Sequence, residues 1–488
     1  MNDDRSGRGR PALAASVLIA SLMLGGCAGL VPSPEPVTVA PPAAQWQVAL
    51  PEPAPGSTPA DDLKRWWQQF NDPVLTQLID AAQHASPTIA AAGSNIEQAR
   101  ATWVAGGAAL LPSVDATASA ARRRIDLSTP VISSAAAGVQ AAWEIDLFGA
   151  NRAGRDAAQA RLDGTEASWH GARISVAAET ASAYLSLRAC EAQTVQAALD
   201  ATSRAQTARL TGLAAKAGFQ APANADLARA SAAQGNSILT QQRAQCDLIV
   251  KSLVVLTALP EPGLRQMLAG GTANLPEPAQ IVIAQVPADA LAQRPDLFAA
   301  ERELAAAGAD VTQAQAQRFP SVTLAGAITP IHIAAAGVSA NGTVWSVGPV
   351  TVTVPVFDGG VRRANAVAAQ ARYDAAASDY AARLRTAVRE VEEALIALQA
   401  TAARGADARI AADGFERSYR AVDARYQSGL GSLFDLEDAR RSAVAAQREL
   451  IDLQRERVAA WIALYRALGG GWNAADATDA AANAAPRS

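Results

Sequence analysis

Residues 361–468 restrict what this chain can fold into more than any other stretch. Between Gly360 and Gly429 there is no proline, and glycine occurs only at Gly405 and Gly414, so the sequence predicts one uninterrupted helix. At 1.5 Å per residue, that helix would be about 100 Å long. A helix of this length is too long for the core of an ordinary globular domain. The sequence therefore predicts a protein whose helices span a distance.

Apolar residues follow the spacing of a coiled coil on both sides of a glycine-rich turn at residues 428–432. Successive apolar positions are separated by steps of four and three, as in the seam of a heptad repeat. This pattern predicts two antiparallel arms that pack along the seam. Its members are Leu384, Val388, Val391, Leu395, Leu398 and Ala402 in the first arm, and Leu450, Leu453, Val458, Trp461, Leu464 and Leu468 in the second.

The same order of elements occurs twice along the chain. Each half is predicted to contain a helix, two alternating strands, a long helix, a turn and a shorter helix. In each half the two shorter helices together are about as long as the long one, which predicts a bundle with strands at one end and turns at the other. The matched positions are Pro112 and Pro320, Phe148 and Phe357, and Gly218 and Gly429, which are 208, 209 and 211 residues apart.

These patterns divide the chain into six segments. The first repeat is expected at residues 61–258, with strands at about 113–124 and 137–148, and the second at 294–472, with strands at about 320–331 and 344–357. The other segments are a signal peptide at 1–26, an extended proline-rich tether at 27–60, a connector at 259–293 and a disordered tail at 473–488.

The N-terminus carries the features of a lipoprotein signal. Basic residues precede an apolar run at residues 11–24, which is too short to span a bilayer. The run ends in Leu24-Gly25-Gly26-Cys27, which is similar to a bacterial lipobox, so we expect cleavage before Cys27 and acylation of that residue. The alternative is an ordinary signal peptide with an incidental cysteine. Ala28, rather than an aspartate, favours the outer membrane as the destination.

No later segment contains 18 uninterrupted apolar residues, so no transmembrane helix is expected. A protein that crosses a membrane without such helices must do so as a closed barrel, because unpaired strand edges are not tolerated in lipid. Four strands cannot close a barrel alone, whereas three copies would supply twelve. The strands contain more alanine and threonine than large apolar residues, which makes the membrane signal of the strands weak.

Charge and composition exclude several function classes. The net charge of −4 gives no basic surface for nucleic acid. The three histidines, His84, His170 and His332, have no metal-ligand spacing, and the chain contains no nucleophile elbow, phosphate loop or CxxC motif. We therefore expect no catalytic residues, no metal site and no cofactor.

Several motifs, taken in order, resemble those of one family. They are Trp66-Trp67 with Phe70-Asn71-Asp72-Pro73, Trp143–Gly149, Gln293–Leu297 with Ala300-Glu301, Phe319–Val322, Pro355–Gly360 and Tyr426–Ala439. Each is weakly specific alone, but their order and spacing extend over nearly the whole mature chain. The chain resembles the outer membrane factors of tripartite efflux pumps (the TolC/OprM type), and among them the NodT-like outer-membrane lipoprotein branch.

The resemblance implies a mainly α-helical protein that forms a homotrimer. A 12-stranded membrane β-barrel would continue into a long periplasmic α-helical coiled-coil barrel. Such a channel is a passive exit duct for small molecules such as drugs or toxic compounds, and its energy comes from an inner-membrane pump of the resistance-nodulation-division type. The resemblance also implies a periplasmic adaptor at the tip turns, which contain Gly218, Phe219, Gly429, Leu430 and Gly431. Acylated Cys27 would hold the protein in outer-membrane lipid.

The resemblance further implies a periplasmic gate at the second tip. Asp435 and Asp438 match the two constriction aspartates of the family, Tyr426 matches a tyrosine of the gate network, and Asp226 matches its partner in the first repeat. In a trimer each aspartate would form a ring of three mutually repelling carboxylates. The alternative is that these aspartates are capping or solvated residues at a helix start.

Two features of the tips depart from the family pattern. Pro222 makes the register of the first tip uncertain, and Gly431 stands where some relatives have a gating arginine. Whether Arg425, Arg440 or Arg441 supplies that charge is left open by the sequence.

Cys190 and Cys246 lie at equal sequence distances from the tip glycine Gly218. Antiparallel arms would bring the two cysteines to the same height, where a disulfide is expected in an oxidising periplasm. The alternative is two buried free thiols.

Three other functions remain as alternatives. The first is an outer-membrane channel for type I secretion. The second is a lipidated periplasmic adaptor, although adaptors have one hairpin where this chain has two. The third is a soluble coiled-coil scaffold.

Overall fold

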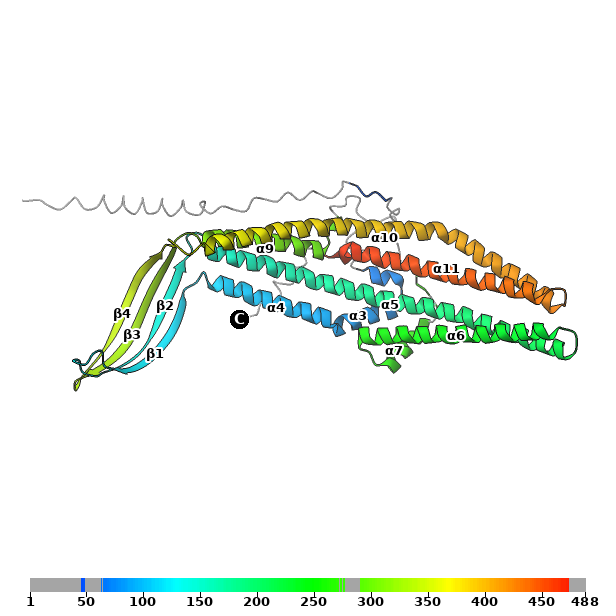
Figure 1. Cartoon of the computed structure of the whole chain (residues 1–488), viewed down its shortest axis with the longest axis horizontal. Coiled ribbons are helices and arrows are strands. Elements are labelled where there is room, and N and C mark those ends of the chain that lie inside the picture. The colour runs from blue at the N-terminus through cyan, green and yellow to red at the C-terminus, as the bar shows by residue number, and fades with distance from the viewer. Residues whose placement is uncertain are drawn as a thin grey trace, which may run out of the picture. The chain divides into compact units, whose positions relative to one another are not determined.

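The computed structural model describes residues 45–48, 63, 65–271, 273, 275–276 and 290–473 (Figure 1). The expected signal peptide, Cys27, most of the tether and the tail from residue 474 lie outside the described residues. Two compact units are present. Among the described residues, the sheet unit lies within the ranges 94–166 and 299–382, and the tip unit lies within the ranges 45–93, 167–298 and 383–473. Within the described part, no helix is long and apolar enough to cross a bilayer.

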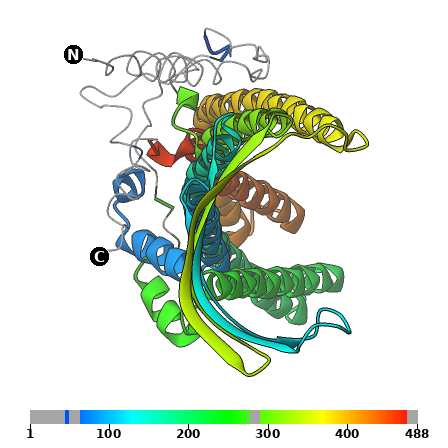
Figure 2. The same ribbon diagram turned by 90° about the vertical axis from the view of Figure 1, so that its left-hand side faces the viewer.

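The sheet unit contains one antiparallel sheet with strand order β1-β2-β3-β4. The strands are β1 (Ser113–Arg123), β2 (Ile132–Ile145), β3 (Ser321–Ala335) and β4 (Val338–Thr353). Strands β2 and β3 come from different repeats and pair over most of their length. Strands β1 and β4 are the two edges, and the sheet is strongly curved (Figure 2).

Strands β2, β3 and β4 extend further from the helices than the sequence predicted, and β2 and β4 end earlier beside the helices. Strands β3 and β4 meet at Ala336 and Gly337, which both have positive φ, as a tight two-residue hairpin requires. No Asn-Gly or Asp-Gly signal marks this turn, so the strands were predicted too short there. At the other end, β2 stops at Ile145 rather than residue 148, because the Asp146 carboxylate accepts hydrogen bonds from the backbone N–H groups of Asn151 and Arg152.

Strand β4 likewise stops at Thr353 rather than residue 357. The Asp358 carboxylate accepts hydrogen bonds from the backbone N–H groups of Gly360 and Arg362, which shapes the start of the following helix. These contacts hold the pKa of Asp358 below its usual range, and the bond from Arg362 contributes most. In both repeats, an aspartate thus ends the strand and begins the long helix.

The pairing register gives the sheet two chemically different faces. One face is apolar over most of its length, and the opposite face is mostly polar, because residues alternate along each strand. The apolar face carries Val114, Val139, Trp143, Ile145, Val322, Leu324, Ile328, Trp345, Val347, Val350 and Val352, and many of these side chains are exposed. The opposite face carries Asp115, Thr117, Gln140, Glu144, Thr323, Thr329, Ser346 and Thr351.

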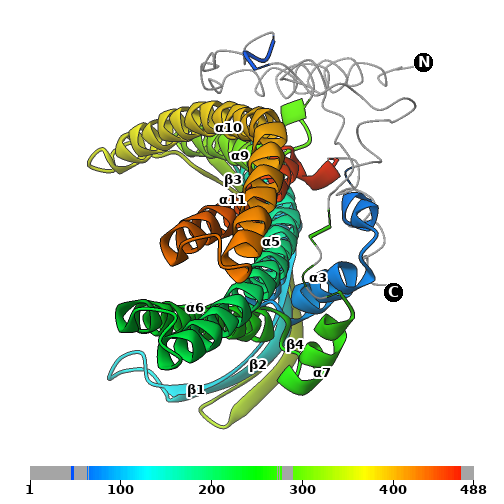
Figure 3. The same cartoon turned by 90° about the vertical axis from the view of Figure 1, so that its right-hand side faces the viewer.

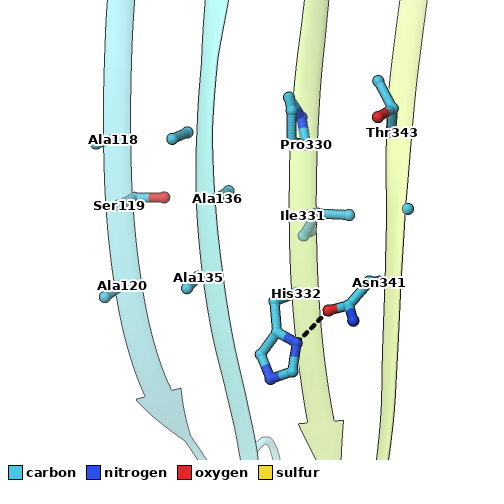
Figure 4. Close-up of a pocket in the computed structure, with 12 residues that line it drawn as sticks. Ala118, Ser119, Ala120, Ala135, Ala136, Pro330, Ile331, His332, Asn341 and Thr343 are labelled. Atoms are coloured by element: carbon cyan, nitrogen blue, oxygen red, sulfur yellow. Dashed lines mark hydrogen bonds between the residues drawn. The ribbon is translucent and has the colours of Figure 1, made fainter.

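The apolar face becomes polar near the β3–β4 hairpin. His332 points toward Asn341, and its ring Nδ1 hydrogen-bonds the Asn341 Oδ1 (Figure 4). Neighbouring positions on the other strands carry only small side chains, such as Ala118 and Ala135, so the surface is shallowly hollowed there. The apolar part of this face is therefore a band with a polar boundary.

Helices of the sheet unit pack closely at the start of the long helices. These are α5 (Ala150–Lys216) and α10 (Val361–Gln427), which continue into the tip unit, and the shorter helices α4 (Pro87–Ala108) and α9 (Pro295–Ala316). Between α5 and α9, Arg161 Nη2 donates to Asp310 Oδ2 at 2.5 Å, and its Nε lies 3.5 Å from Glu303. A small core of α9 and α10 contains Ala307, Val311, Ala369 and Tyr373.

The tip unit is built on two helical hairpins (Figure 3). Helix α5 pairs with α6 (Pro222–Thr257), and α10 pairs with α11 (Leu433–Ala467). The disulfide between Cys190 and Cys246 joins the arms of the first hairpin, with Cα atoms 5.6 Å apart. In the second hairpin, Val391, Leu395 and Trp461 of the predicted seam are buried, whereas Ala402 is exposed and Thr401 takes the buried position.

An aromatic cluster anchors the N-terminal segment of the tip unit. Trp66 and Trp67, in a short 3-10 helix (Trp66–Phe70), pack against Tyr465 of α11 with ring centroids 5.0 and 4.8 Å away. Helix α3 (Pro73–Ala85) follows and joins the same core. Asp72 caps α3, because its Oδ1 accepts from the backbone N–H groups of Val74 and Leu75. The Trp-Trp motif of the sequence therefore has a structural role.

Asp72 is also tied to a buried arginine through a tyrosine. The Tyr184 hydroxyl donates to Asp72 Oδ2 at 2.5 Å and accepts from Arg188 Nε at 3.0 Å. Arg188 is fully buried, and its Nη1 donates to Glu191 and to the carbonyl of Leu268, the last residue of helix α7 (Glu261–Leu268). Burial raises the pKa of Tyr184 to about 12, and the hydrogen bond to Asp72 acts in the same direction.

We expect Tyr184→Phe to lower the free energy of unfolding by about 1–3 kcal/mol, because it leaves Arg188 Nε buried without its acceptor. A phenol ionises near pH 10 when unfolded, and this one ionises near pH 12 in the native protein, so its stabilising effect is complete below pH 10 and is lost as the pH rises toward 12. The deficit of the variant should therefore shrink above pH 10. Urea unfolding followed by circular dichroism would measure both effects.

Tyr380→Phe, at a half-buried tyrosine of α10 outside this network, is the matched control. Equal deficits in the two variants, or a deficit in Tyr184→Phe that does not change with pH, would contradict the assigned role of Tyr184.

Candidate functional site at the hairpin tips

Each hairpin turns at a glycine in the left-handed region. Gly218 and Gly429 both have a φ of 79°, which side chains with a Cβ rarely adopt. After the first turn α6 begins at Pro222, and after the second turn the Ser432 hydroxyl caps α11 by accepting from the Asp435 backbone N–H at 3.1 Å. The positions of both turns are therefore determined by local sequence.

The turns expose large apolar side chains. Phe219 is 84% exposed, Leu430 is 76% exposed and Phe434 is 70% exposed. Large apolar groups concentrated at a loop tip indicate a contact surface for another protein.

The aspartates predicted to form the gate lie at the surface of α11. Asp435 and Asp438 are both directed away from the buried side of that helix, which carries Leu433, Leu436 and Arg440. Asp438 lies 3.8 Å from Arg441, and both side chains are exposed. Within one chain, Arg441 thus contacts Asp438 through an exposed pair, whereas Arg440 pairs with Glu437.

The other two predicted gate residues have different surroundings. The Tyr426 hydroxyl lies 2.6 Å from Thr211 Oγ1, so this tyrosine links the second hairpin to the first. Asp226 is exposed and pairs with Arg229 of its own helix at 2.7 Å. The structure brings Tyr426 to the neighbouring hairpin, and Asp226 interacts locally.

A buried charged cluster joins the two hairpins, and we call it the tip clamp. It consists of Asp200 and Arg204 on α5 and Glu437 and Arg440 on α11. Arg204 Nε contacts both carboxylate oxygens of Asp200, at 2.9 and 2.8 Å, and Arg204 Nη1 lies 3.4 Å from Glu437 Oε2. Arg440 Nη1 donates to Glu437 Oε1 at 2.5 Å. Two cations and two anions therefore balance one another.

Hydroxyl groups add further hydrogen bonds to the tip clamp. Arg440 Nη2 donates to Ser203 and Thr207, at 3.2 and 3.0 Å, and Ser231 Oγ donates to Glu437 at 2.8 Å. The Arg440 guanidinium also lies over the Tyr419 ring, 5.6 Å from its centroid. Buried charges are stable only when they are paired and hydrogen-bonded in this way.

Asp200, Arg204 and Glu437 were not predicted from the sequence as residues of this site. Their spacing gave a signal, because Asp200 and Arg204 are four residues apart and Glu437 and Arg440 are three apart on their helices. Such pairs usually lie on a solvated helix face, and the sequence does not show that two of them face each other. No group of three potential metal ligands occurs among the residues that the structure describes.

We expect Arg440→Met to speed amide hydrogen exchange around residues 200–207 and 228–235, because it leaves Glu437 and Asp200 buried with one cation fewer. Removing one partner of a buried ion pair typically costs about 3–5 kcal/mol. Arg441→Met is the matched control: its side chain is exposed, and loss of a surface pair typically costs less than about 1 kcal/mol. Equal exchange in the two variants would contradict a stabilising role for the tip clamp.

Comparisons with known proteins agree with this architecture. A family model described as outer membrane efflux protein matches residues 78–258 and 286–470. The chain is 31% identical over 478 residues to outer membrane protein OprJ of Pseudomonas aeruginosa, a match that covers 95% of this chain and 97% of OprJ. It is 30% identical over 476 residues to the solvent efflux pump outer membrane protein SrpC of Pseudomonas putida, covering 93% and 98% of the two chains.

Among solved structures, the outer-membrane channel OprN matches with a TM-score of 0.77 and 26% identity, covering 90% of this chain and 99% of OprN. The family resemblance carried by the sequence motifs is confirmed. The chain belongs to the outer membrane efflux protein family.

Proposed function

We propose that this protein is the outer-membrane channel of a tripartite efflux system, a passive exit duct formed by three copies of the chain. Three four-stranded sheets would close into a 12-stranded barrel in the outer membrane, and the long helices of the three copies would wall a periplasmic tunnel. The exported molecules would be small, such as drugs or toxic compounds. An inner-membrane pump, of the resistance-nodulation-division type, would supply the energy.

The observation that carries this proposal is the exposed apolar face of a sheet with two open edges. Along β4 and the residue that follows it, the face extends from Trp345 to Val354, about 30 Å at 3.3 Å per residue. At a strand tilt of about 40°, this length spans roughly 23 Å, close to the height of the apolar band on membrane barrels. The polar boundary at His332 and Asn341 would then lie at the edge of the lipid.

Polar residues on the opposite face fit a water-filled lumen. Asp115, Gln140, Thr323 and Thr351 project from that side of the sheet. A lipid-facing apolar side and a lumen-facing polar side alternate along each strand of such barrels.

The exposed tips fit contact with a periplasmic adaptor. The turns contain Gly218 and Gly429 at positive φ, with Gly431 nearby, and they present the exposed apolar side chains of Phe219 and Leu430. The two hairpins of this chain and the family to which it belongs argue against its being a lipidated adaptor. A channel for type I secretion would share this architecture, and the names of relatives such as SrpC favour efflux.

We propose that Asp435 and Asp438 form the gate as two rings of three carboxylates. Both side chains are exposed in one chain and lie on a face that the chain itself does not cover. At 4 Å, two like charges repel by about 4 kcal/mol at an effective dielectric constant of 20, so the closed state would depend on bound cations or neighbouring arginines.

The double variant Asp435→Ala, Asp438→Ala should conduct better than the wild type in planar lipid bilayers, and divalent cations should block it less. The matched control is Asp407→Ala, Asp413→Ala, which removes two exposed aspartates of α10 outside the tip. Unchanged conductance and unchanged cation block in the gate variant would refute the carboxylate rings.

The proposed lipid anchor can be tested separately. Labelling cells with palmitate should label the wild type and a Cys190→Ser, Cys246→Ser variant equally, because those cysteines form the disulfide. Cys27→Ser should abolish the label and release the N-terminus from the membrane. Labelling that persists in Cys27→Ser would contradict acylation at that residue.

A further inference from the structure

A cavity of about 440 Å³ lies in the tip unit, beside the aromatic cluster that anchors the N-terminal segment. It is bounded by residues 65–68, by α3, by α5 and by the residues that follow α11. Small-molecule sites in proteins typically have volumes of about 300–1,000 Å³, so this cavity is large enough to hold one. We call it the α3–α5 pocket, and its polar lining includes Arg65, Asp80, Gln83, Arg173 and Trp472.

Arg173 of α5 is half-buried, and its contacts in the structure are with neutral groups. Its Nη2 donates to Gln83 Oε1 at 3.2 Å, and its guanidinium lies over the Trp169 ring, 5.0 Å from the ring centroid. Gln83 Nε2 in turn donates to the Arg173 carbonyl at 3.2 Å. No carboxylate of the described residues lies within 4.0 Å of this guanidinium, so its charge is not compensated by an ion pair.

The buried arginines of the same unit differ from Arg173 in this respect. Each of them pairs with a carboxylate on its own helix or close by in the chain, because a cation withdrawn from water without a counterion is costly. These pairs are Arg188 with Glu191, Arg294 with Asp296 and Arg440 with Glu437.

A second cation lines the α3–α5 pocket. Arg65 is exposed and, like Arg173, has no carboxylate of the described residues within 4.0 Å. Asp80 is exposed, lines the same cavity and makes no ion pair with either arginine. With His170 neutral, two cations and one anion leave the lining with a net positive charge.

Trp472 adds a buried hydrogen-bond donor to the lining. Its side chain is 5% exposed, and its indole Nε1 has no hydrogen-bond partner among the residues that the structure describes. Indole and guanidinium groups can only donate hydrogen bonds. The open positions of the pocket therefore require an acceptor, and its net charge favours a negative one.

We propose that the α3–α5 pocket binds a small organic anion that carries two or more carboxylate or phosphate groups. The guanidinium fork matches the oxygen atoms of both kinds of group. One anionic group pairs with Arg173, a second pairs with Arg65, and an oxygen atom of the ligand accepts from Trp472 Nε1. A free phosphate ion is much smaller than the cavity, so the occupant is an organic molecule. This site is independent of the proposed channel function.

A bound anion would connect three parts of the tip unit. Arg65 belongs to the N-terminal segment, Arg173 to α5, and Trp472 to the segment that follows α11. A ligand that binds only the folded chain stabilises that fold. We therefore expect the anion to hold these three segments together.

Isothermal titration calorimetry of the full chain in detergent tests the site, with citrate and inorganic phosphate as probes at constant ionic strength. Citrate should bind at one molecule per chain and at least about tenfold more tightly than phosphate, because its carboxylates can reach both arginines. Phosphate that binds when citrate does not would overturn the assignment to an organic anion. The absence of saturable binding by both probes would overturn the site itself.

Substitutions of the lining test the assigned contacts. Arg173→Met and Arg65→Met should each weaken citrate binding at least about tenfold, and Trp472→Phe, which keeps a ring and removes the N–H group, about three- to tenfold. Arg209→Met, at an exposed residue of α5 outside the cavity, is the matched control and should leave binding unchanged. Equal weakening in Arg209→Met would mean that the whole protein attracts anions, and it would contradict the site. Arg65 is exposed, so its variant keeps the test decisive if Arg173→Met does not fold.

Removal of the acidic group should have the opposite effect. Asp80→Asn should tighten citrate binding about threefold, because it removes the negative charge that lines the cavity. Asp407→Asn, at an exposed residue of α10 outside the cavity, changes the net charge equally and should leave binding unchanged. Weaker binding in Asp80→Asn would contradict an anionic ligand.

Discussion

The four-stranded sheet has two unpaired edges and an exposed apolar face, and both must be covered. Backbone N–H and C=O groups at the edges need hydrogen-bond partners, and an apolar band that includes Trp345 and Val347 is unfavourable in water. In the proposed assembly, further strands from identical chains would pair with the edges, and lipid would cover the apolar band. We therefore expect the sheet to be stable as part of such an assembly, in keeping with the membership of the chain in the outer membrane efflux protein family.

The internal duplication already pairs one edge strand of each repeat. The chain already contains one complete junction, with β2 paired to β3 and Phe148 packed on Phe319. The proposed ring would need one further kind of junction, between the edge strands β1 and β4.

Near the tips, buried charged side chains join the two hairpins. Asp200, Arg204, Glu437 and Arg440 connect the hairpins through groups that are costly to separate, because each would leave a charge unpaired. Tyr426 and Thr211 add a further link between the same hairpins. Asp435 and Asp438 are exposed and lie away from the buried side of α11. One helix thus carries both the buried links between the hairpins and the aspartates of the proposed gate.

Features set by local chemistry could be predicted from the sequence. The long helices followed from the absence of proline, the tips from Gly218 and Gly429, and the pairing of Cys190 with Cys246 is a contact that antiparallel arms bring within reach. The family resemblance followed from motif order. The β3–β4 turn was missed because Ala336 adopts positive φ without any asparagine or aspartate signal.

Features set by tertiary pairing could not be predicted in this way. The sequence predicted alternation along single strands, but an apolar face that extends across the sheet became visible only with the register, which aligns the apolar positions of the four strands. The tip clamp depends on two helices from different repeats facing each other, which no local pattern encodes.

The most direct test of the proposed three-chain assembly is the mass of the intact protein in detergent, measured by native mass spectrometry. We expect a single species of three chains. A stable species of one chain, with its sheet edges still open to hydrogen exchange, would contradict it.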